Sequence, residues 1–403
     1  MNFKKRIAYI IFAVTIISGC EDLMTKKLDI DVADYPPQLA VTAILDTDSG
    51  CFSISMFAGY SMNYYKEWRP EAENVSGNGN IHLYMDDDSD PVLSFSGLFR
   101  LSGTKQQYYF DGKDTIYHDW YSYFNGYDNT FFDIPVKAGS IYRLEVEIDG
   151  FPKVTSTAVM PDDPIIGDVV VDTSTVVTKN NPTAIWSLNS GWWWVGSNHF
   201  WPINLRLTDN SSLPDYYSFS IYNISTQTYD GVYYRNENQT GIGTTNKTLI
   251  QDNPDVEAEG MLIELGGTPR DIYVFEKMLI SDASFANTST YFPLYMIPID
   301  LYNYTHYKKR PDYNPDIHGP ENKSTEIIYL EVKHLSKETF MHYRSLAQQW
   351  AGGGILSEPV FIKSNIENGW GCFSLSNTKR IKLLECDYYR YPEWYYYQAI
   401  DNE

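Results

Sequence analysis

In the stretch Gln38–Leu45, QLAVTAIL, every second side chain is apolar, as in a half-buried β-strand. The next apolar stretch, Cys51–Ala58 (CFSISMFA), repeats the alternation, and the turn-forming residues Asp46–Gly50 separate the two. More short stretches of strand character follow before residue 160, namely Asn80–Met85, Gln107–Phe110, Thr130–Ile134, Ser140–Ile148 and Lys153–Val159. Short strands at this spacing predict an immunoglobulin-like β-sandwich over residues 36–160.

A domain boundary is predicted at Met160–Pro164, MPDDP, because two prolines and two acids cannot continue a central strand. The chain is long enough for two domains, and the second is predicted to be a larger β-rich domain over residues 161–403. Its clearest strand is Thr325–Lys333, and its one predicted helix covers residues 336–350 with Ser336 as N-cap. Apolar residues at helical spacing are expected to face the core, namely Phe340, Tyr343, Leu346, Ala347 and Trp350. The predicted fold class is therefore mainly β.

The first 22 residues, MNFKKRIAYIIFAVTIISGCED, have the three-part layout of a secretory signal. A basic head precedes an apolar run, Ile7–Ile17, which is short for a membrane span of ~20 residues. The run ends in Ile17-Ser18-Gly19-Cys20, which resembles a bacterial lipobox whose cysteine is acylated. We therefore expect a signal peptide over residues 1–19 and a lipidated tether over residues 20–35. Two or three acyl chains on Cys20 would hold the protein on a membrane.

The acidic pair Glu21 and Asp22 follows the predicted lipidation site directly. Acidic residues at this place resemble the surface-export signal of lipoproteins in the Bacteroidetes group. This resemblance implies a lipoprotein of the bacterial outer membrane that faces the cell exterior. The alternative is a solvated linker on an anchor that faces the periplasm.

Charge and composition limit the classes of partner. The 403 residues carry a formal charge of −21. A surface with this charge repels nucleic acid and anionic lipid, so nucleic acid is not expected as a partner. Aromatic residues are in conspicuous excess, with 34 Tyr, 19 Phe and 10 Trp. They are explained either by Tyr-rich strands or by exposed rings that stack on sugars or on a protein partner.

The best candidates for ligand or partner contact are clustered tryptophans. Trp192, Trp193 and Trp194 are consecutive, with Trp201 close behind, and nearby Gly and Asn residues favour a loop. The aromatic C-terminal stretch adds a second candidate surface around Trp394 and Tyr396.

No catalytic residue, cofactor or metal ligand is predicted, and the chain is not expected to be an enzyme. The acidic run Asp86–Asp90 spaces its oxygens as a calcium loop does, but it lacks the loop glycine and distal glutamate of an EF-hand, which favours a solvated hairpin tip. Dispersed carboxylates of a glycoside hydrolase stay open as an alternative. Cys372 and Cys386 flank an expected hairpin turning at Ser376–Thr378, and they could form a disulfide, leaving Cys51 free.

Several segments together carry a resemblance to a family: Gln38–Thr42, Ala138–Leu144, Val159–Pro161, Asp215–Tyr217, Ser357–Val360 and Ser364–Phe373. In this order, and with the closing block NIENGWGCF, they resemble a Bacteroidetes outer-membrane lipoprotein family of unknown function, commonly encoded beside SusC-type TonB-dependent receptors. The resemblance implies a location and a receptor partner, and it implies no chemistry.

The function expected from these features is that of a non-catalytic surface lipoprotein. It would assist a TonB-dependent receptor in capturing or taking up a nutrient, a glycan or a peptide. The alternative is an adhesion or envelope-structural lipoprotein without a role in transport.

Overall fold

The computed structural model describes residues 38–48, 50–59, 75–101, 109–111, 114–116, 127–179, 184–187, 191–194, 199–211, 213–229, 232–246, 272–297, 322–351 and 361–390. These residues are mainly β and include one α-helix, as the sequence predicts. No helix within these ranges is long and apolar enough to cross a membrane.

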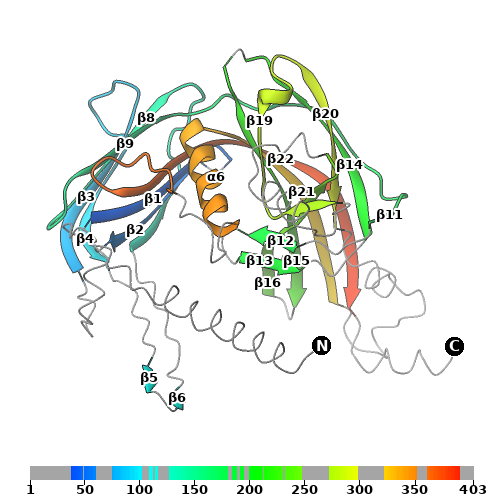
Figure 1. The fold of residues 1–403 in the computed structure, drawn as a ribbon, viewed down its shortest axis with the longest axis horizontal. Helices are drawn as coiled ribbons and strands as arrows, with labels where there is room; N and C mark the ends of the chain where they lie inside the picture. The colour runs from blue at the N-terminus through cyan, green and yellow to red at the C-terminus, as the bar shows by residue number, and fades with distance from the viewer. Residues whose placement is uncertain are drawn as a thin grey trace, which may run out of the picture. The chain divides into compact units, whose positions relative to one another are not determined.

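One eight-stranded sheet joins the beginning of the described chain to its end (Figure 1). Its strands are β16 (Val232–Thr240), β15 (Tyr216–Tyr229), β21 (Asn322–Leu335), β22 (Trp370–Arg390), β1 (Gln38–Asp46), β2 (Cys51–Gly59) and β7 (Tyr127–Phe131), in this order, with β19 (Met278–Ser281) also paired to β15. We call it the long sheet. The pairing of β1 with β22 is parallel, whereas its other pairings are antiparallel.

Three further sheets complete the described fold. A second eight-stranded sheet has the order β10 (Ile165–Val171), β14 (His199–Thr208), β20 (Ser289–Met296), β17 (Ile242–Thr244), β18 (Tyr273–Phe275), β12 (Ala184–Ser187) and β13 (Gly191–Trp194), with β11 (Val177–Thr178) on β14. A four-stranded sheet has the order β4 (Leu93–Leu101), β3 (Val75–Met85), β8 (Ile141–Ile148) and β9 (Val154–Val159). The strands β5 (Tyr109–Asp111) and β6 (Asp114–Ile116) form a hairpin.

The first predicted strand pair is confirmed. β1 and β2 pair antiparallel across the expected turn, and one face of β1 is completely buried, namely Leu39, Val41, Ala43 and Leu45. Burying a side chain such as Leu or Val stabilises the fold by about 1.5–3 kcal/mol relative to leaving it exposed. The alternation in the sequence therefore gives β1 its orientation in the core.

The N-terminal strands form a β-sandwich, with aromatic rings between its layers. Phe52 of β2 and Phe131 of β7 lie 6.1 Å apart, and Phe131 lies 5.4 Å from Phe95 of β4. The four-stranded sheet thus packs on the β1–β2–β7 part of the long sheet. The acidic run 86–90 is exposed at the tip between β3 and β4, which confirms the predicted hairpin tip.

A second core lies between the long sheet and the second eight-stranded sheet. Strands β15, β19 and β21 contribute from the first, and β14, β17, β18 and β20 from the second. Phe219 of β15 meets Phe292 of β20 edge-on at 5.6 Å, and both side chains are fully buried. This core holds the two sheets together next to the candidate site described below.

Two glycines allow β1 and β22 to approach each other. Gly371 has φ +112, and a Cβ there would lie 1.9 Å from the carbonyl oxygen of Val41. At Gly369 a Cβ would lie 2.6 Å from the carbonyl oxygen of Leu39. The closing NIENGWG block therefore carries glycine where the backbone of the first strand occupies the space of a side chain.

The predicted hairpin at Ser376–Thr378 is wrong. These residues lie inside β22, which pairs with β21 from Ser376 to Arg390, with one irregularity beside Ile328. Their polar groups bond to neighbouring segments instead of making a turn: the hydroxyls of Ser376 and Thr378 donate to Asp46 Oδ2 at 2.7 and 2.8 Å. Cys372 is a buried free thiol, and its burial raises its pKa to about 12.

The predicted helix is confirmed as α6 (Lys337–Ala351). The backbone N–H of Thr339 donates to Ser336 Oγ at 3.3 Å, so Ser336 is the N-cap. Phe340 and Ala347 are buried as expected, while Tyr343 and Leu346 are half-buried. The side chain of Trp350 lies outside the described residues.

The division at residues 160/161 stays a prediction, to which the structure adds that strands from both sides share the long sheet. The boundary segment itself is fixed to β22. The side-chain amide of Asn377 donates to the Pro161 carbonyl at 3.2 Å and to Asp163 Oδ1 at 2.7 Å. Lys379 Nζ donates to the Pro164 carbonyl at 3.1 Å.

Gly371→Ala is expected to destabilise the protein more than Gly150→Ala. Both glycines have positive φ, but a Cβ at Gly150 would meet nothing within 4 Å, so that variant reports backbone strain alone, about 1–2 kcal/mol. The contact with Val41 adds to this cost at Gly371. Urea unfolding of both variants measures the difference, and equal destabilisation would contradict the close approach of β1 and β22.

Candidate functional site

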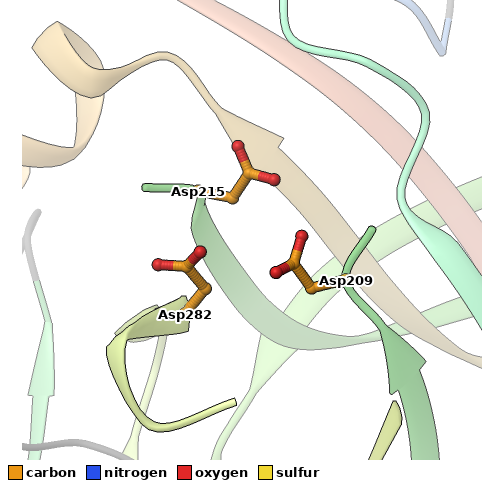
Figure 2. A group of neighbouring side chains, drawn as sticks. All are labelled: Asp209, Asp215 and Asp282. Atoms are coloured by element: carbon orange, nitrogen blue, oxygen red, sulfur yellow. The ribbon is translucent and has the colours of Figure 1, made fainter. Parts of the chain in front are cut away.

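Three aspartates from two segments of the chain converge where the long sheet meets the second eight-stranded sheet (Figure 2). Asp209 follows β14, Asp215 precedes β15, and Asp282 follows β19 as the first residue of the short 3-10 helix η2 (Asp282–Ser284). One carboxylate oxygen of each lies within 4.8 Å of the others. We call these residues the aspartate cluster.

Strand pairing brings the cluster together. Tyr216 of β15 pairs with Ser281 of β19, which places Asp215 beside Asp282, and the backbone N–H of Asp282 donates to the Asp215 carbonyl at 3.0 Å. Thr208 of β14 pairs with Ser289 of β20, so that Asp209 lies next to the turn that leaves η2. The cluster therefore depends on the register of two strand pairs.

Asp209 is fixed by backbone donors. Its Oδ1 accepts from the N–H of Ser211 at 2.9 Å, and its Oδ2 accepts from the N–H of Asn287 at 2.6 Å. Asn287 has φ +58, the left-handed conformation that asparagine tolerates. These bonds hold a carboxylate that is only 2% exposed.

Asp215 is oriented by a histidine. His334 Nε2 lies 3.3 Å from Asp215 Oδ1, and His334 Nδ1 lies 2.8 Å from the Asp162 carbonyl oxygen, which can only accept. His334 therefore carries a proton on Nδ1, and its ring stacks on Tyr217 at 4.8 Å. Burial raises the pKa of Asp215 and the Asp209 and Asp282 carboxylates raise it further, which outweighs the attraction of His334.

Asp282 has the least compensation. Asp282 is only 3% exposed, and its Oδ2 has no hydrogen-bond partner among the described residues. Burial raises the pKa of Asp282, and the Asp209 carboxylate raises it further. Hydrogen bonds from the backbone of Asp215 and of Asp282 itself lower the pKa, but they do not outweigh these two effects. An unpaired charge in such a place is costly unless it is neutralised by a proton or a cation.

The electrostatic conflict within the cluster is large. Two unit charges 4–5 Å apart repel each other by about 3–4 kcal/mol at an effective dielectric constant of ~20. Within the described ranges, no Lys or Arg forms an ion pair with Asp209 or Asp282. The geometry can therefore hold shared protons or one positive ion.

A polar groove of about 680 Å³ lies elsewhere, on strands β3, β4 and β8. Gly79 and Gly97 pair across β3 and β4 at its floor, and its walls present hydrogen-bonding side chains, namely Asn78, Asn80, Ser96, Glu147, Asp149 and Lys153. Lys153 Nζ lies 2.8 Å from Glu147 Oε1. The half-buried aromatic residue Phe151 also lines the groove.

The structure buries one of the residues predicted for ligand contact. Trp201 is 5% exposed and belongs to the core between the two large sheets, because it lies on β14 with its ring on the inner face. Trp192–Trp194 form strand β13 rather than the expected loop, paired with β12 as Trp193 opposite Ile185. Their side chains lie outside the described residues, as do Cys20, Glu21, Asp22, Trp394 and Tyr396.

Sequence patterns give only a weak sign of the aspartate cluster. Each aspartate stands singly beside the end of a strand. In the sequence, strands of both large sheets lie between Asp215 and Asp282. A weak signal exists in Asp209-Asn210-Ser211 and in Asp215-Tyr216-Tyr217, where an acid interrupts an apolar strand pattern. Only the sheet register shows that they meet.

In metal-free buffer, Asp282→Asn is expected to stabilise the protein by about 1–3 kcal/mol near pH 7. The pKa of Asp282 is raised above its ordinary value near 3.8, so the folded state holds this proton more tightly than the unfolded state does. The wild-type protein therefore loses folding stability as pH rises from about 4 through the pKa of Asp282 in the folded protein. The gain from the variant should therefore grow with pH.

Urea unfolding of both proteins at pH 4 and pH 7 with a chelator measures this gain. Asp88→Asn, at an exposed position, is the control. A gain for Asp282→Asn that is the same at both pH values would contradict the raised pKa.

Comparison with known proteins gives a family for nearly the whole chain. Residues 25–382 match the family described as "Domain of unknown function (DUF4249)". No curated protein matches the chain. The match includes both large sheets, the aspartate cluster and the helix α6. The chain belongs to the DUF4249 family, a domain of unknown function.

Proposed function

We propose that this protein is an outer-membrane lipoprotein, held by acyl chains on Cys20 and exposed at the cell surface through the signal of Glu21 and Asp22. It acts as a non-catalytic accessory of a TonB-dependent receptor in the capture of a nutrient. The observation that carries the proposal is the lipobox Ile17–Cys20 behind a basic and apolar leader. The family resemblance stated for the sequence supports the receptor as partner.

The length of the segment between Cys20 and the first described strand suits a capture role. Residues 21–37 separate Cys20 from the first described strand, and a fully extended chain of that length reaches at most about 60 Å. The segment is polar and carries several charges. A tether with this reach allows the folded part to bind both the membrane receptor and a ligand outside it.

The polar groove on β3, β4 and β8 supports a glycan as the nutrient. Its volume of about 680 Å³ is in the range of small-ligand sites, about 300–1,000 Å³. Amide, hydroxyl, carboxylate and ammonium groups on its walls match the donors and acceptors of sugar hydroxyls. Phe151 adds an apolar surface on which a sugar ring can stack.

The aspartate cluster does not favour a glycoside hydrolase. Its geometry would require a sugar to enter between carboxylates, but Asp209 is 2% and Asp282 is 3% exposed. Burial of this degree leaves room for an ion or a proton and none for a sugar ring. The aspartate cluster therefore gives no support to the hydrolase alternative.

Cys20→Ser is expected to abolish acylation, because serine lacks the thiol that accepts the lipid. Metabolic labelling with a palmitate analogue should mark the wild type and leave the variant unmarked as an uncleaved precursor. Normal cleavage and membrane retention of the variant would refute the lipid anchor.

The matched control changes Glu21 and Asp22 to Ala and keeps Cys20. It should stay acylated in the membrane fraction, while protease added to intact cells should remove the wild type and spare the control. Removal of both proteins at the same rate would show that the acidic pair does not direct export.

Changing Trp192, Trp193 and Trp194 together to Ala is expected to weaken the receptor complex. Truncating one tryptophan at the centre of an interface costs ~2 kcal/mol or more, about thirtyfold in affinity. Affinity purification from mild detergent, with mass spectrometry of the bound proteins, compares variant and wild type after thermal melting has shown that both fold.

A wild type that brings down no TonB-dependent receptor would refute the accessory role and leave adhesion or envelope structure as the alternative. Equal recovery with both proteins would keep the complex and move its contact surface away from Trp192–Trp194.

A further inference from the structure

One carboxylate oxygen of the aspartate cluster has no hydrogen-bond partner among the described residues. It is Oδ2 of Asp282, a residue that is only 3% exposed. In Figure 2 its carboxylate lies beside those of Asp209 and Asp215, around a common space. Most buried carboxylate oxygens are hydrogen-bonded or bound to a metal, so the Asp282 carboxylate can accept a further ligand.

We propose that Asp209, Asp215 and Asp282 bind one Ca²⁺ ion. Each of the three carboxylates offers one oxygen to a common ion, and backbone carbonyls or water would supply the rest of the six to eight oxygen ligands that Ca²⁺ takes at 2.3–2.6 Å. Ligand atoms within 4.8 Å of one another can all reach a single ion between them. The ion would also supply the positive charge that the cluster lacks.

The chemistry of the ligands selects the type of ion. All three residues offer oxygen, which suits a hard cation, and no thiolate or imidazole points to zinc or another soft metal. Mg²⁺ usually keeps several of its water molecules and needs near-octahedral geometry. Ca²⁺ accepts longer bonds and a more flexible arrangement of ligands, so it fits this cluster better than Mg²⁺.

The surroundings hold the ligands in place before the ion binds. Two backbone N–H groups fix Asp209, and His334 fixes Asp215. The other nitrogen of His334 bonds the Asp162 carbonyl, so the site is linked to the segment between the two predicted domains. His334 is a positioning residue. The ion would tie η2 to the segment that connects β14 and β15.

Equilibrium dialysis with radioactive Ca²⁺ tests the site on the full-length protein in detergent after removal of metals with a chelator. The wild type should bind one Ca²⁺ per chain at this site, and CaCl₂ should raise its melting temperature more than the same concentration of MgCl₂. Asp282→Asn should weaken binding at least tenfold. Asp88→Asn, in the exposed acidic run that resembles a calcium loop, should bind as the wild type does.

The effect of Asp282→Asn on the melting temperature should change sign with the metal. Without Ca²⁺ the variant should melt above the wild type, because a repulsive charge is gone; with saturating Ca²⁺ it should melt below it. A purely structural role of Asp282 would give the same sign in both buffers. Should Asp282→Asn fail to fold, Asp215→Asn takes its place in the dialysis and must also weaken binding at least tenfold.

Three results would overturn the proposal. The first is a wild type that binds no Ca²⁺ up to millimolar concentration. The second is undiminished binding in Asp282→Asn and Asp215→Asn. The third is loss of the bound ion in Asp88→Asn, which would assign it to the hairpin tip between β3 and β4.

Discussion

The backbone contact between β1 and β22 is the constraint on which the rest of the structure depends. It joins the first described strand to the last, and it exists only because Gly369 and Gly371 leave room for the carbonyl groups of β1. Asp46 at the end of β1 then accepts from Lys333 Nζ at 2.7 Å as well as from two hydroxyls of β22. Because the contact spans the chain, the long sheet can be completed only after most of the sequence has been ordered, which is typical of slowly folding β topologies.

Two buried aspartates show how the fold treats charge in opposite ways. Burial alone would raise the pKa of Asp46, but Lys333 and neighbouring hydrogen bonds outweigh it and lower the pKa below its ordinary value. At Asp282 burial also dominates, and the Asp209 carboxylate raises the pKa further. The first arrangement is a network of paired charges that also includes the buried Glu331 and the more exposed Arg380. The second is uncompensated, and perturbed groups of this kind gather at functional sites.

The groove and the aspartate cluster lie on different sheets and would serve different purposes. The groove is built on the outer side of β3, β4 and β8, where glycines and short polar side chains leave open space. The cluster is enclosed between strands β14, β15 and β19, where the core of the two large sheets fixes its geometry. A bound ion would therefore stabilise the scaffold that presents the groove, without occupying the place of a nutrient. The separation of the groove from the aspartate cluster suits the role proposed above, a tethered binding protein that releases its ligand to a receptor.

The sequence by itself determined the mainly β class, the β1–β2 pair, helix α6 with its Ser336 cap and the exposed tip at residues 86–90, because each follows from local periodicity or capping chemistry. It did not reveal that Ser376–Thr378 continue a strand, because those polar residues are satisfied by Asp46, far away in the chain. Nor did it reveal that Trp201 is buried or that three single aspartates meet. Only the tertiary structure decided these features, since strand register between distant segments sets them and no local pattern in the chain encodes that register.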